Sequence, residues 1–551
     1  MRHDSGLKHR LNPIDEMCRN MLQVKYINNR GTLTMTACAT RGILPGTVIV
    51  GNLFLPLPET DFRDYLNEIE ELAKSAPEII ESIEKDLDVH ARKEKKIRLE
   101  DKKYLASRTA DLPNLNIRER NLLADELNLA VGRPRMPGYA VYVFLMMRGF
   151  LGSLTSQPAR RFLHESMSLY GFLQSRGLSM PGATTILENV NLISQGTRDL
   201  IFRKQTALIL REDLDDFKQL TIDSTAVKAN SCWPTDARIL TGLLTRANRL
   251  GQKLHVFGLK NLRLGWVPHW LAEMDRQEFQ ICLAAGKPKS KGKLKKRYRQ
   301  LLKRGQKATD FITDELNRLK ARLEPELLEP SRRMLLRQVM QQIEADITDA
   351  QNVIKYAGDR VFKGQTLPST QKVLSLADGS AAYIQKGSRA AVIGYKPQLV
   401  RSAKGFVTSL IVPQGNASDS VEFTPAIRDS ISRTGVVAEL VSTDDGYASA
   451  KGRSAVLAMG VKDISISGAK GKRLTDPDDW KSDVYRNARR ERSAVESLMF
   501  TIKDGFEFGE LGRRGLEAVR AELLEKVLAY NFCRIILMRK QKRREAFDKA
   551  A

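Results

Sequence analysis

A chain of 551 residues is too long for one hydrophobic core, which rarely grows past about 250 to 300 residues, so the sequence predicts several domains. With 42% hydrophobic and 28% charged residues, the composition is that of a globular protein and excludes a disordered or fibrous chain. The net charge of +25 favours a polyanionic partner. Nucleic acid is the first candidate, although charge alone does not exclude other basic classes of protein.

Several features argue against metal-binding cysteines and membrane segments. The five cysteines are scattered, with no C-x-x-C pair and no histidine at ligand spacing, which speaks against zinc and structural disulfides. The first residues, MRHDSGLKHRLNP, lack the apolar core of a signal peptide. The most apolar run, 140–147, is far shorter than the roughly 20 residues that span a bilayer. We therefore expect no membrane partner and a reducing cytoplasm.

The first half of the chain predicts two helical modules. Residues 1–135 combine a Gly- and Pro-punctuated apolar stretch with a charged helical run, and form a predicted N-terminal module that is a candidate for DNA binding. Residues 136–215 have a helical pattern broken at Gly177 and Pro181, and are predicted to bind DNA or to mediate dimerisation. Neither module shows a helix-turn-helix signature.

Strand patterns begin at FKQLTIDSTAV, which alternates apolar and polar residues from Phe217. Residues 236–365 are mostly helical in pattern and predict an inserted helical subdomain. Three strand-like runs then predict an antiparallel meander: VLSLADGSAAYI, AAVIGYKPQLV and GFVTSLIVPQ. GVVAELVST and VKDISISG flank a predicted helix at 447–458, which indicates a parallel β-α-β unit.

A long helix follows, and this order is the pattern of a ribonuclease H-like domain. We therefore expect a multi-domain α/β plus α protein with a ribonuclease H-like mixed sheet, a long helical insertion after the first strand and helical N-terminal domains. The catalytic domain is predicted to comprise residues 216–235 and 366–515, interrupted by the insertion at 236–365. Residues 516–551 are predicted to form a C-terminal helix with a basic tail.

Two aspartates lie at predicted strand ends. Asp223 ends the apolar alternation of the first strand, where a bare charge would be costly and a bound metal would neutralise it. Asp444 follows an apolar strand and precedes a turn, the place where α/β sheets carry ligands. A turn or helix N-cap aspartate is the alternative role for Asp444, and Asp445 is the alternative ligand.

The third acidic candidate, Glu496, lies in YRNARRERSAVESLMFTIKDG, which predicts one helix ending at Gly505. On such a helix Arg492, Glu496 and Lys503 fall within about 40° of one another. One face would then carry a carboxylate between two cations. An ordinary salt-bridged surface face is the alternative.

These acidic blocks resemble the motifs of the DDE transposases of bacterial insertion sequences. TIDSTAVKANSCWPTDARIL resembles their D-[ST]-T-x-V segment followed by a P-T-D element. The block DDGYAS resembles D-x-G-Y-x-S, which selects Asp444 over Asp445. The resemblance covers roughly residues 140–510 and is absent from the first 130.

The third block resembles the Y-R-E-K signature of that family. Arg492, Glu496 and Lys503 keep its spacing. Arg489 stands where the tyrosine is expected, and Tyr485 lies one helical turn earlier, so the tyrosine of the signature is not matched.

The resemblance implies that Asp223, Asp444 and Glu496 are the catalytic residues and hold two Mg²⁺ or Mn²⁺ ions. It implies cleavage at transposon ends and strand transfer into target DNA by two-metal in-line phosphoryl transfer, without a covalent enzyme intermediate. The partner would be double-stranded DNA, bound by a homodimer in the bacterial cytoplasm at the nucleoid.

The expected DNA contacts fall into two groups. By the resemblance, Arg492 and Lys503 would hold phosphates beside the scissile bond. Tyr447 is also expected to contact DNA. The run KPKSKGKLKKRYRQLLKR predicts a backbone-binding tract with Lys295, Lys296 and Arg297 at its centre, unless it is a solvated helix face. The basic tail RKQKRR is treated in the same way.

Two other functions compete with transposition. One is a catalytically inactive or repurposed DNA-binding relative that kept the fold. The other is a palm-type polymerase, because the residues around Asp444 and Asp445 resemble its x-x-D-D turn. A polymerase needs a hairpin there, whereas GYASAKGRSAVLAM predicts a helix.

Overall fold

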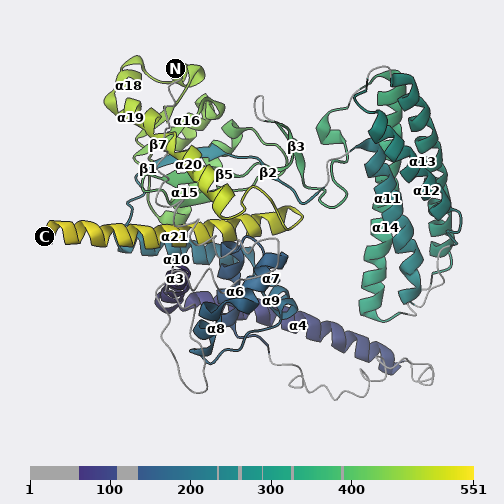
Figure 1. Cartoon of the computed structure of the whole chain (residues 1–551), viewed down its shortest axis with the longest axis horizontal. Coiled ribbons are helices and arrows are strands. Elements are labelled where there is room, and N and C mark those ends of the chain that lie inside the picture. Colours follow the sequence, from purple (N-terminus) through teal and green to yellow (C-terminus); the bar gives the residue numbers. More distant parts are fainter. Residues whose placement is uncertain are drawn as a thin grey trace, which may run out of the picture. The chain divides into compact units, whose positions relative to one another are not determined.

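The computed structural model describes residues 61–107, 135–231, 235–257, 263–287, 290–323, 328–365, 367–385 and 390–550 (Figure 1). These residues form two compact units. The sheet unit comprises the described residues up to 88, those from 135 to 230 and those from 384 onward. The helical unit comprises the described residues of 89–134 and 231–383. None of the described helices is long and apolar enough to cross a membrane.

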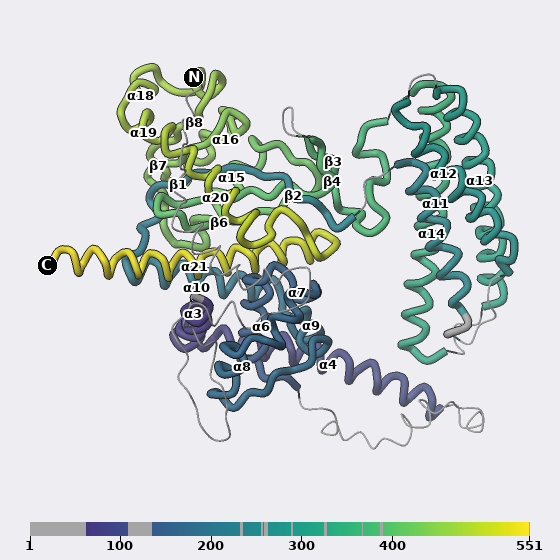
Figure 2. Tube along the Cα trace, viewed as in Figure 1, coloured from purple at the N-terminus to yellow at the C-terminus, as the bar shows by residue number. Residues whose placement is uncertain are grey.

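The centre of the sheet unit is a mixed five-stranded sheet in the order β6-β5-β1-β7-β8. Its strands are β1 (Gln219–Ser224), β5 (Gln398–Ser402), β6 (Val407–Ile411), β7 (Leu440–Thr443) and β8 (Asp463–Ile466). β5 is antiparallel to β1 and β6, whereas β7 is parallel to β1 and β8. Figure 2 shows β1 among strands that come much later in the chain. The sheet is compatible with the ribonuclease H-like domain expected from the sequence.

One apolar core of the sheet unit forms where α15 (Asp419–Thr434) and α16 (Ala450–Leu457) pack on the sheet. Side chains alternate between the two faces of a strand, so Leu220 and Ile222 of β1 enter this core while Thr221 and Asp223 point to the other face. The alternation read in the sequence therefore sets which residues of β1 are available to a site.

Six described helices besides the apolar helix α6 (Gly138–Phe150) precede β1. They are α3 (Asp61–Ser75), α4 (Glu78–Ser107), α7 (Gln157–Glu165), α8 (Met167–Gln174), α9 (Ala183–Asn191) and α10 (Gln195–Arg211), of which α4 extends into the helical unit. Among them, α3 and α9 pack against α6. Every residue of α6 except Tyr139 is buried. Ser156, Ser166 and Ser194 start α7, α8 and α10 by accepting a hydrogen bond from a backbone N–H three residues later.

The long C-terminal helix α21 (Leu516–Ala550) packs against α6. Leu524, Leu528, Phe532 and Ile535 recur at helical spacing and are buried, so they serve packing. The two helices approach closely at Gly149, where an added Cβ would lie 2.1 Å from the Glu525 carbonyl oxygen. A side chain at this position would force α6 and α21 apart.

Shorter elements complete the sheet unit. β2 (Val227–Lys228) follows β1 and pairs with β4 (Val392–Tyr395), where a Cβ on Gly394 would lie 1.8 Å from the Val227 carbonyl oxygen. The other elements are η6 (Asp445–Tyr447), α17 (Ala469–Leu474), α18 (Pro477–Lys481), α19 (Asp483–Glu491) and α20 (Ala494–Gly505).

Some predicted elements differ from the observed ones. The first run of the expected meander yields only β3 (Ala382–Ile384), which lies outside the five-stranded sheet. The second run contains two strands, β4 and β5, separated at Lys396 and Pro397. α15 was not expected. The single helix expected to end at Gly505 is two helices, α19 and α20, because the chain turns at Arg492 and Ser493.

The helical unit is built mainly from α11 (Asp236–Gln252), η2 (Lys253–Phe257), α12 (Val267–Ala284), α13 (Lys291–Lys320), α14 (Pro330–Gly358), η4 (Asp359–Lys363) and η5 (Ser369–Gln371). Its core is apolar, with Leu240, Leu301, Ile312 and Ile343 buried between the helices. These residues lie between β2 and β3 in the chain. The boundaries predicted from the sequence for the five domains remain predictions.

Candidate active site

The parallel pairing of β1 and β7 brings two of the three candidate carboxylates to the same edge of the sheet. Thr221 is in register with Ser442, and their hydroxyls are 3.0 Å apart. Asp223 and Asp444 each lie two residues further along, where parallel strands end side by side. Both aspartates are half-buried, so solvent and ligands have access to them.

The structure separates Asp444 from its neighbour Asp445. Asp444 Oδ1 accepts a hydrogen bond from the Gly446 backbone N–H at 3.0 Å, so it also caps η6. Asp445 Oδ1 instead accepts from the Gly471 N–H at 2.8 Å. Asp445 therefore binds the backbone of α17. This contact favours Asp444 as the metal ligand, as the sequence block implies.

A further carboxylate, Asp419, lies at the same place and was missed by the sequence reasoning. Asp419 begins α15 and accepts hydrogen bonds from Lys396 Nζ at 2.9 Å and Gln398 Nε2 at 3.0 Å. Burial alone would raise the pKa of Asp419, but these hydrogen bonds outweigh it and the pKa is lowered. A Cβ on Gly446 would lie 3.1 Å from Asp444 Oδ1 and 3.3 Å from Asp419 Oδ2, so the two carboxylates flank this glycine.

Tyr447 is linked to Asp419 through Gln398. Its ring is fully buried, packs edge-to-face on Phe423 and donates its hydroxyl to Gln398 Oε1. Burial raises the pKa of Tyr447, and the charges of Asp419, Asp223 and Asp444 raise it further. The Tyr447 hydroxyl therefore lies within the electrostatic influence of all three aspartates. Tyr447 was expected to contact DNA; the structure corrects this, because its side chain is part of the core.

Glu496 and its flanking cations lie on or beside α20, which contacts β1. The Glu496 side chain is 64% exposed and its Oε1 lies 3.4 Å from Arg492 Nη2. Lys503 Nζ donates to the Ala226 carbonyl oxygen at 3.1 Å, next to the end of β1. Within the described ranges, no group of three or more His, Cys, Asp or Glu side chains could hold a metal ion. The structure thus pairs Asp223 with Asp444 and does not gather Glu496 with them.

The positions at and before the unmatched signature tyrosine serve packing. Arg489 lies over the Trp480 ring, 4.2 Å from its centroid, and donates to the Trp480 carbonyl oxygen. Tyr485 is buried. Trp233 and Pro234 of the first motif block lie outside the described residues.

The basic tracts differ in how far they are available. Lys295, Lys296 and Arg297 lie near the start of α13 in the helical unit, where Lys296 is exposed and the other two are half-buried. Arg297 donates to Gln277 at 3.3 Å. The contact of this tract with DNA stays a prediction.

The C-terminal tract is held by acidic partners. Arg539 donates to both carboxylate oxygens of Glu212, at 2.6 and 2.7 Å, and also to Glu68. Lys540 pairs with Asp64 at 2.6 Å. This half of the tail therefore fastens α21 to α3 and to the end of α10, and it is not a free phosphate-binding run.

The palm-type polymerase alternative finds no support. η6 and α16 follow Asp444 where a polymerase requires a hairpin, and β8, the next strand, is parallel to β7. A mixed sheet with acidic residues at the ends of its central strands instead fits the class of ribonuclease H-like enzymes that act on polynucleotides.

Residues 362–532 match the protein-family model for the transposase DDE domain. The matched range contains Asp419, Asp444 and Glu496, whereas Asp223 lies before it. The match covers less than half of the chain, and it supports a DDE transposase. No curated protein and no solved structure matches it.

Proposed function

We propose that this transposase cleaves DNA at transposon ends and joins the released 3′-hydroxyl to target DNA by in-line phosphoryl transfer. The observation that carries the proposal is the parallel register of β1 and β7, which brings Asp223 and Asp444 to neighbouring strand ends. The reaction takes place on double-stranded DNA, with two copies of the chain pairing the two ends in the bacterial cytoplasm.

The donor set fits Mg²⁺ or Mn²⁺. Mg²⁺ commonly binds one or two carboxylates and fills its remaining positions with water and substrate phosphate oxygens, so two aspartates suffice to begin a site. When bound, two such ions polarise the scissile phosphate and neutralise charge on the attacking and leaving oxygens. Asp223 and Asp444 would hold them, with Glu496 as the third ligand.

The Glu496 side chain can join Asp223 and Asp444 only after its ion pair with Arg492 has broken. Its ion pair with Arg492 is exposed, and such pairs contribute roughly 0 to 1 kcal/mol, so an arriving phosphate competes easily for the guanidinium. Arg492 then holds the DNA backbone, and Glu496 is released toward the aspartates. Lys503 donates a hydrogen bond to the carbonyl oxygen of Ala226, which lies between β1 and β2, and so keeps β2 in place.

The rest of the network orients Asp444. Lys396 and Gln398 fix Asp419, and Gln398 also fixes Tyr447, so the turn that carries Asp444 has few alternative arrangements. The Gly446 N–H holds Asp444 Oδ1 directly. Preorganised ligands of this kind avoid reorganisation when the phosphate charge develops.

Replacing Asp223 or Asp444 by asparagine tests the proposal. Each variant should lose metal-dependent cleavage of DNA carrying the transposon end by roughly 1,000-fold, or about 4 kcal/mol of transition-state stabilisation. DNA affinity should stay within a few-fold. Asp445→Asn is the matched control, because the new amide oxygen can still accept from Gly471.

Equal cleavage by Asp223→Asn and the unmodified chain would reject the assignment of Asp223. DNA binding without cleavage by the unmodified chain, with Mg²⁺ or Mn²⁺ present, would instead identify an inactive DNA-binding relative.

A further inference from the structure

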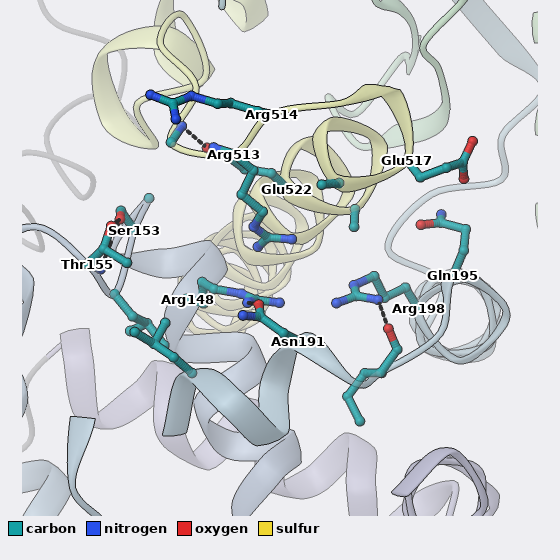
Figure 3. A pocket seen from close by; sticks show the side chains of 17 residues that line it. Arg148, Ser153, Thr155, Asn191, Gln195, Arg198, Arg513, Arg514, Glu517 and Glu522 are labelled. Carbon is teal, nitrogen blue, oxygen red and sulfur yellow. Dashed lines mark hydrogen bonds between the residues drawn. The ribbon is translucent and has the colours of Figure 1, made fainter. Parts of the chain in front are cut away.

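A cavity of about 550 Å³ in the sheet unit is lined by arginines from three separate segments. Arg148 comes from α6, Arg198 from α10, and Arg513 and Arg514 from the loop before α21. Figure 3 shows Arg148 and Arg198 side by side, with Arg513 reaching toward the space between them from another wall. Ser153, Thr155 and Asn191 add neutral hydrogen-bonding groups to the lining.

Three of these guanidinium groups form ion pairs with the same carboxylate. Glu525, whose side chain is 1% exposed, accepts from Arg148 Nη2 and from Arg198 Nε, both at 2.7 Å, and from Arg513. Arg148 and Arg198 are themselves almost fully buried. Around Glu525 the positive charges therefore outnumber the negative ones, in a place where uncompensated charge is costly.

The other acidic residues that line the cavity do not neutralise this excess of positive charge. Glu522 is paired with the buried Lys526, with 2.8 Å between Oε1 and Nζ. Glu517 is exposed and lies 2.7 Å from Arg520. Burial lowers the pKa of Arg148, Glu525 raises it, and the nearby Arg513 and Arg198 lower it, so that the pKa falls to about 10. An anion in the cavity would relieve this repulsion.

The chemistry of the lining selects a phosphate among anions. A guanidinium presents up to five N–H donors in a planar fork that matches phosphate oxygens, and several guanidiniums together match a tetrahedral group better than a planar carboxylate. The hydroxyls of Ser153 and Thr155 and the amide of Asn191 are donors of the kind that complete such sites. We propose that this cavity is a phosphate-binding site.

The position of the cavity favours DNA as the source of the phosphate. Its rim is hydrogen-bonded to the chain that leaves β1: Arg514 Nε donates to the Asn230 carbonyl oxygen at 3.1 Å, and Asn230 Nδ2 donates to the Gly512 carbonyl oxygen at 2.8 Å. Asn230 is seven residues after Asp223, a span of at most about 25 Å. A DNA strand lying at the carboxylates can therefore place a phosphate, within the strand or at its end, in the cavity.

Arg513→Gln in the full chain is the primary test. Inorganic phosphate should raise the thermal unfolding temperature of the unmodified protein above that in potassium chloride of equal ionic strength, because a ligand that binds the folded state stabilises it. Arg513→Gln should weaken the apparent phosphate affinity by about 10- to 100-fold, as expected for loss of one charge-assisted contact. Arg211→Gln, an exposed arginine of α10 outside the cavity, is the control and should bind as the unmodified chain does.

A second variant keeps the test valid if Arg513→Gln fails to fold. Arg514 is exposed and lines the cavity, so Arg514→Gln should fold normally and weaken phosphate binding by about threefold. If phosphate stabilises no more than chloride does, or if neither variant weakens its binding, the arginine cluster is structural only and the proposal is wrong.

Oligonucleotide competition then identifies the source. Short duplexes with and without a 5′-phosphate are added against inorganic phosphate, using the Asp223→Asn chain so that no cleavage occurs. Competition by the 5′-phosphorylated duplex alone indicates a strand end, equal competition by both indicates the DNA backbone, and competition by neither, with phosphate still bound, indicates free phosphate and overturns the DNA source. The DNA source rests on the proposed function, whereas phosphate binding itself, measured by thermal unfolding, does not depend on the catalytic assignment.

Discussion

Replacing Glu525 by glutamine should destabilise the protein strongly. The substitution keeps the shape of the side chain but removes the only carboxylate that faces Arg148, Arg198 and Arg513 among the described residues. Removing one partner of a buried ion pair typically costs about 3 to 5 kcal/mol, because the remaining charge is left uncompensated. Three guanidiniums share Glu525, so we expect the upper part of this range. That loss is a large fraction of the roughly 5 to 15 kcal/mol that stabilises a typical folded protein.

Urea unfolding measures this loss. The midpoint for Glu525→Gln should fall well below that of the unmodified chain, while the slope stays the same. Glu517→Gln is the matched control on the same helix: Glu517 is 75% exposed, and its pair with Arg520 should contribute less than about 1 kcal/mol. A cost below about 1 kcal/mol for Glu525→Gln would refute the view that this cluster holds α6, α10 and α21 together.

Acid should reveal the same interaction. Burial raises the pKa of Glu525, but Arg148, Arg513 and Arg198 outweigh burial and lower it far below the ordinary value of 4.5. The carboxylate therefore contributes its full stabilisation above about pH 4.5 and loses it progressively as the pH falls below that value. The unfolding free energy of Glu525→Gln should lack this portion of the acid dependence, and an identical pH profile below 4.5 would contradict the assignment.

Three further outcomes are expected. Tyr447→Phe leaves Gln398 without its buried donor and should lower the unfolding free energy by about 1 to 2 kcal/mol, with DNA affinity unchanged in a filter-binding assay. Arg539→Gln breaks a partly buried ion-pair network and should shift the thermal midpoint more than it shifts DNA affinity; the reverse order would restore the tail as a DNA contact. Replacing Lys295 and Lys296 with glutamine should flatten the salt dependence of DNA binding by roughly one to two in log–log slope if α13 grips phosphates, and an unchanged slope would exclude it.

Local patterns in the sequence predicted the elements on which the site is built. The alternation Leu220, Thr221, Ile222 and Asp223 fixed which face of β1 enters the core, because strand side chains alternate regardless of the partner strands. The buried stripe of α21 follows from helical periodicity in the same way.

Groups assembled from distant segments could not be predicted. Asp419 precedes no recognisable motif, and its place beside Asp444 depends on the packing of α15 against the sheet. The cluster around Glu525 joins residues such as Arg148, 377 positions away in the chain, so no local window contains it. The turn at Arg492 and Ser493 interrupts a run of good helix formers, and tertiary packing rather than propensity decides it.

The basic tail shows why charge runs mislead. Arg539 and Lys540 read as a tract open to polyanions, yet their partners Glu68, Glu212 and Asp64 come from more than 300 residues earlier in the chain. A run of like charges reports the local composition of one segment, whereas its availability depends on what the fold brings opposite to it.

The pairing of Thr221 with Ser442, 221 residues apart, also sets the order of events during synthesis. β1 leaves the ribosome long before β5 and β7 exist, and the intervening helices can fold on their own local contacts while it waits. A chain released early by a premature stop therefore carries Asp223 without its companion. On the proposed function, such a fragment lacks one of the two aspartates of the site, so DNA cleavage is expected only from copies long enough to include Asp444.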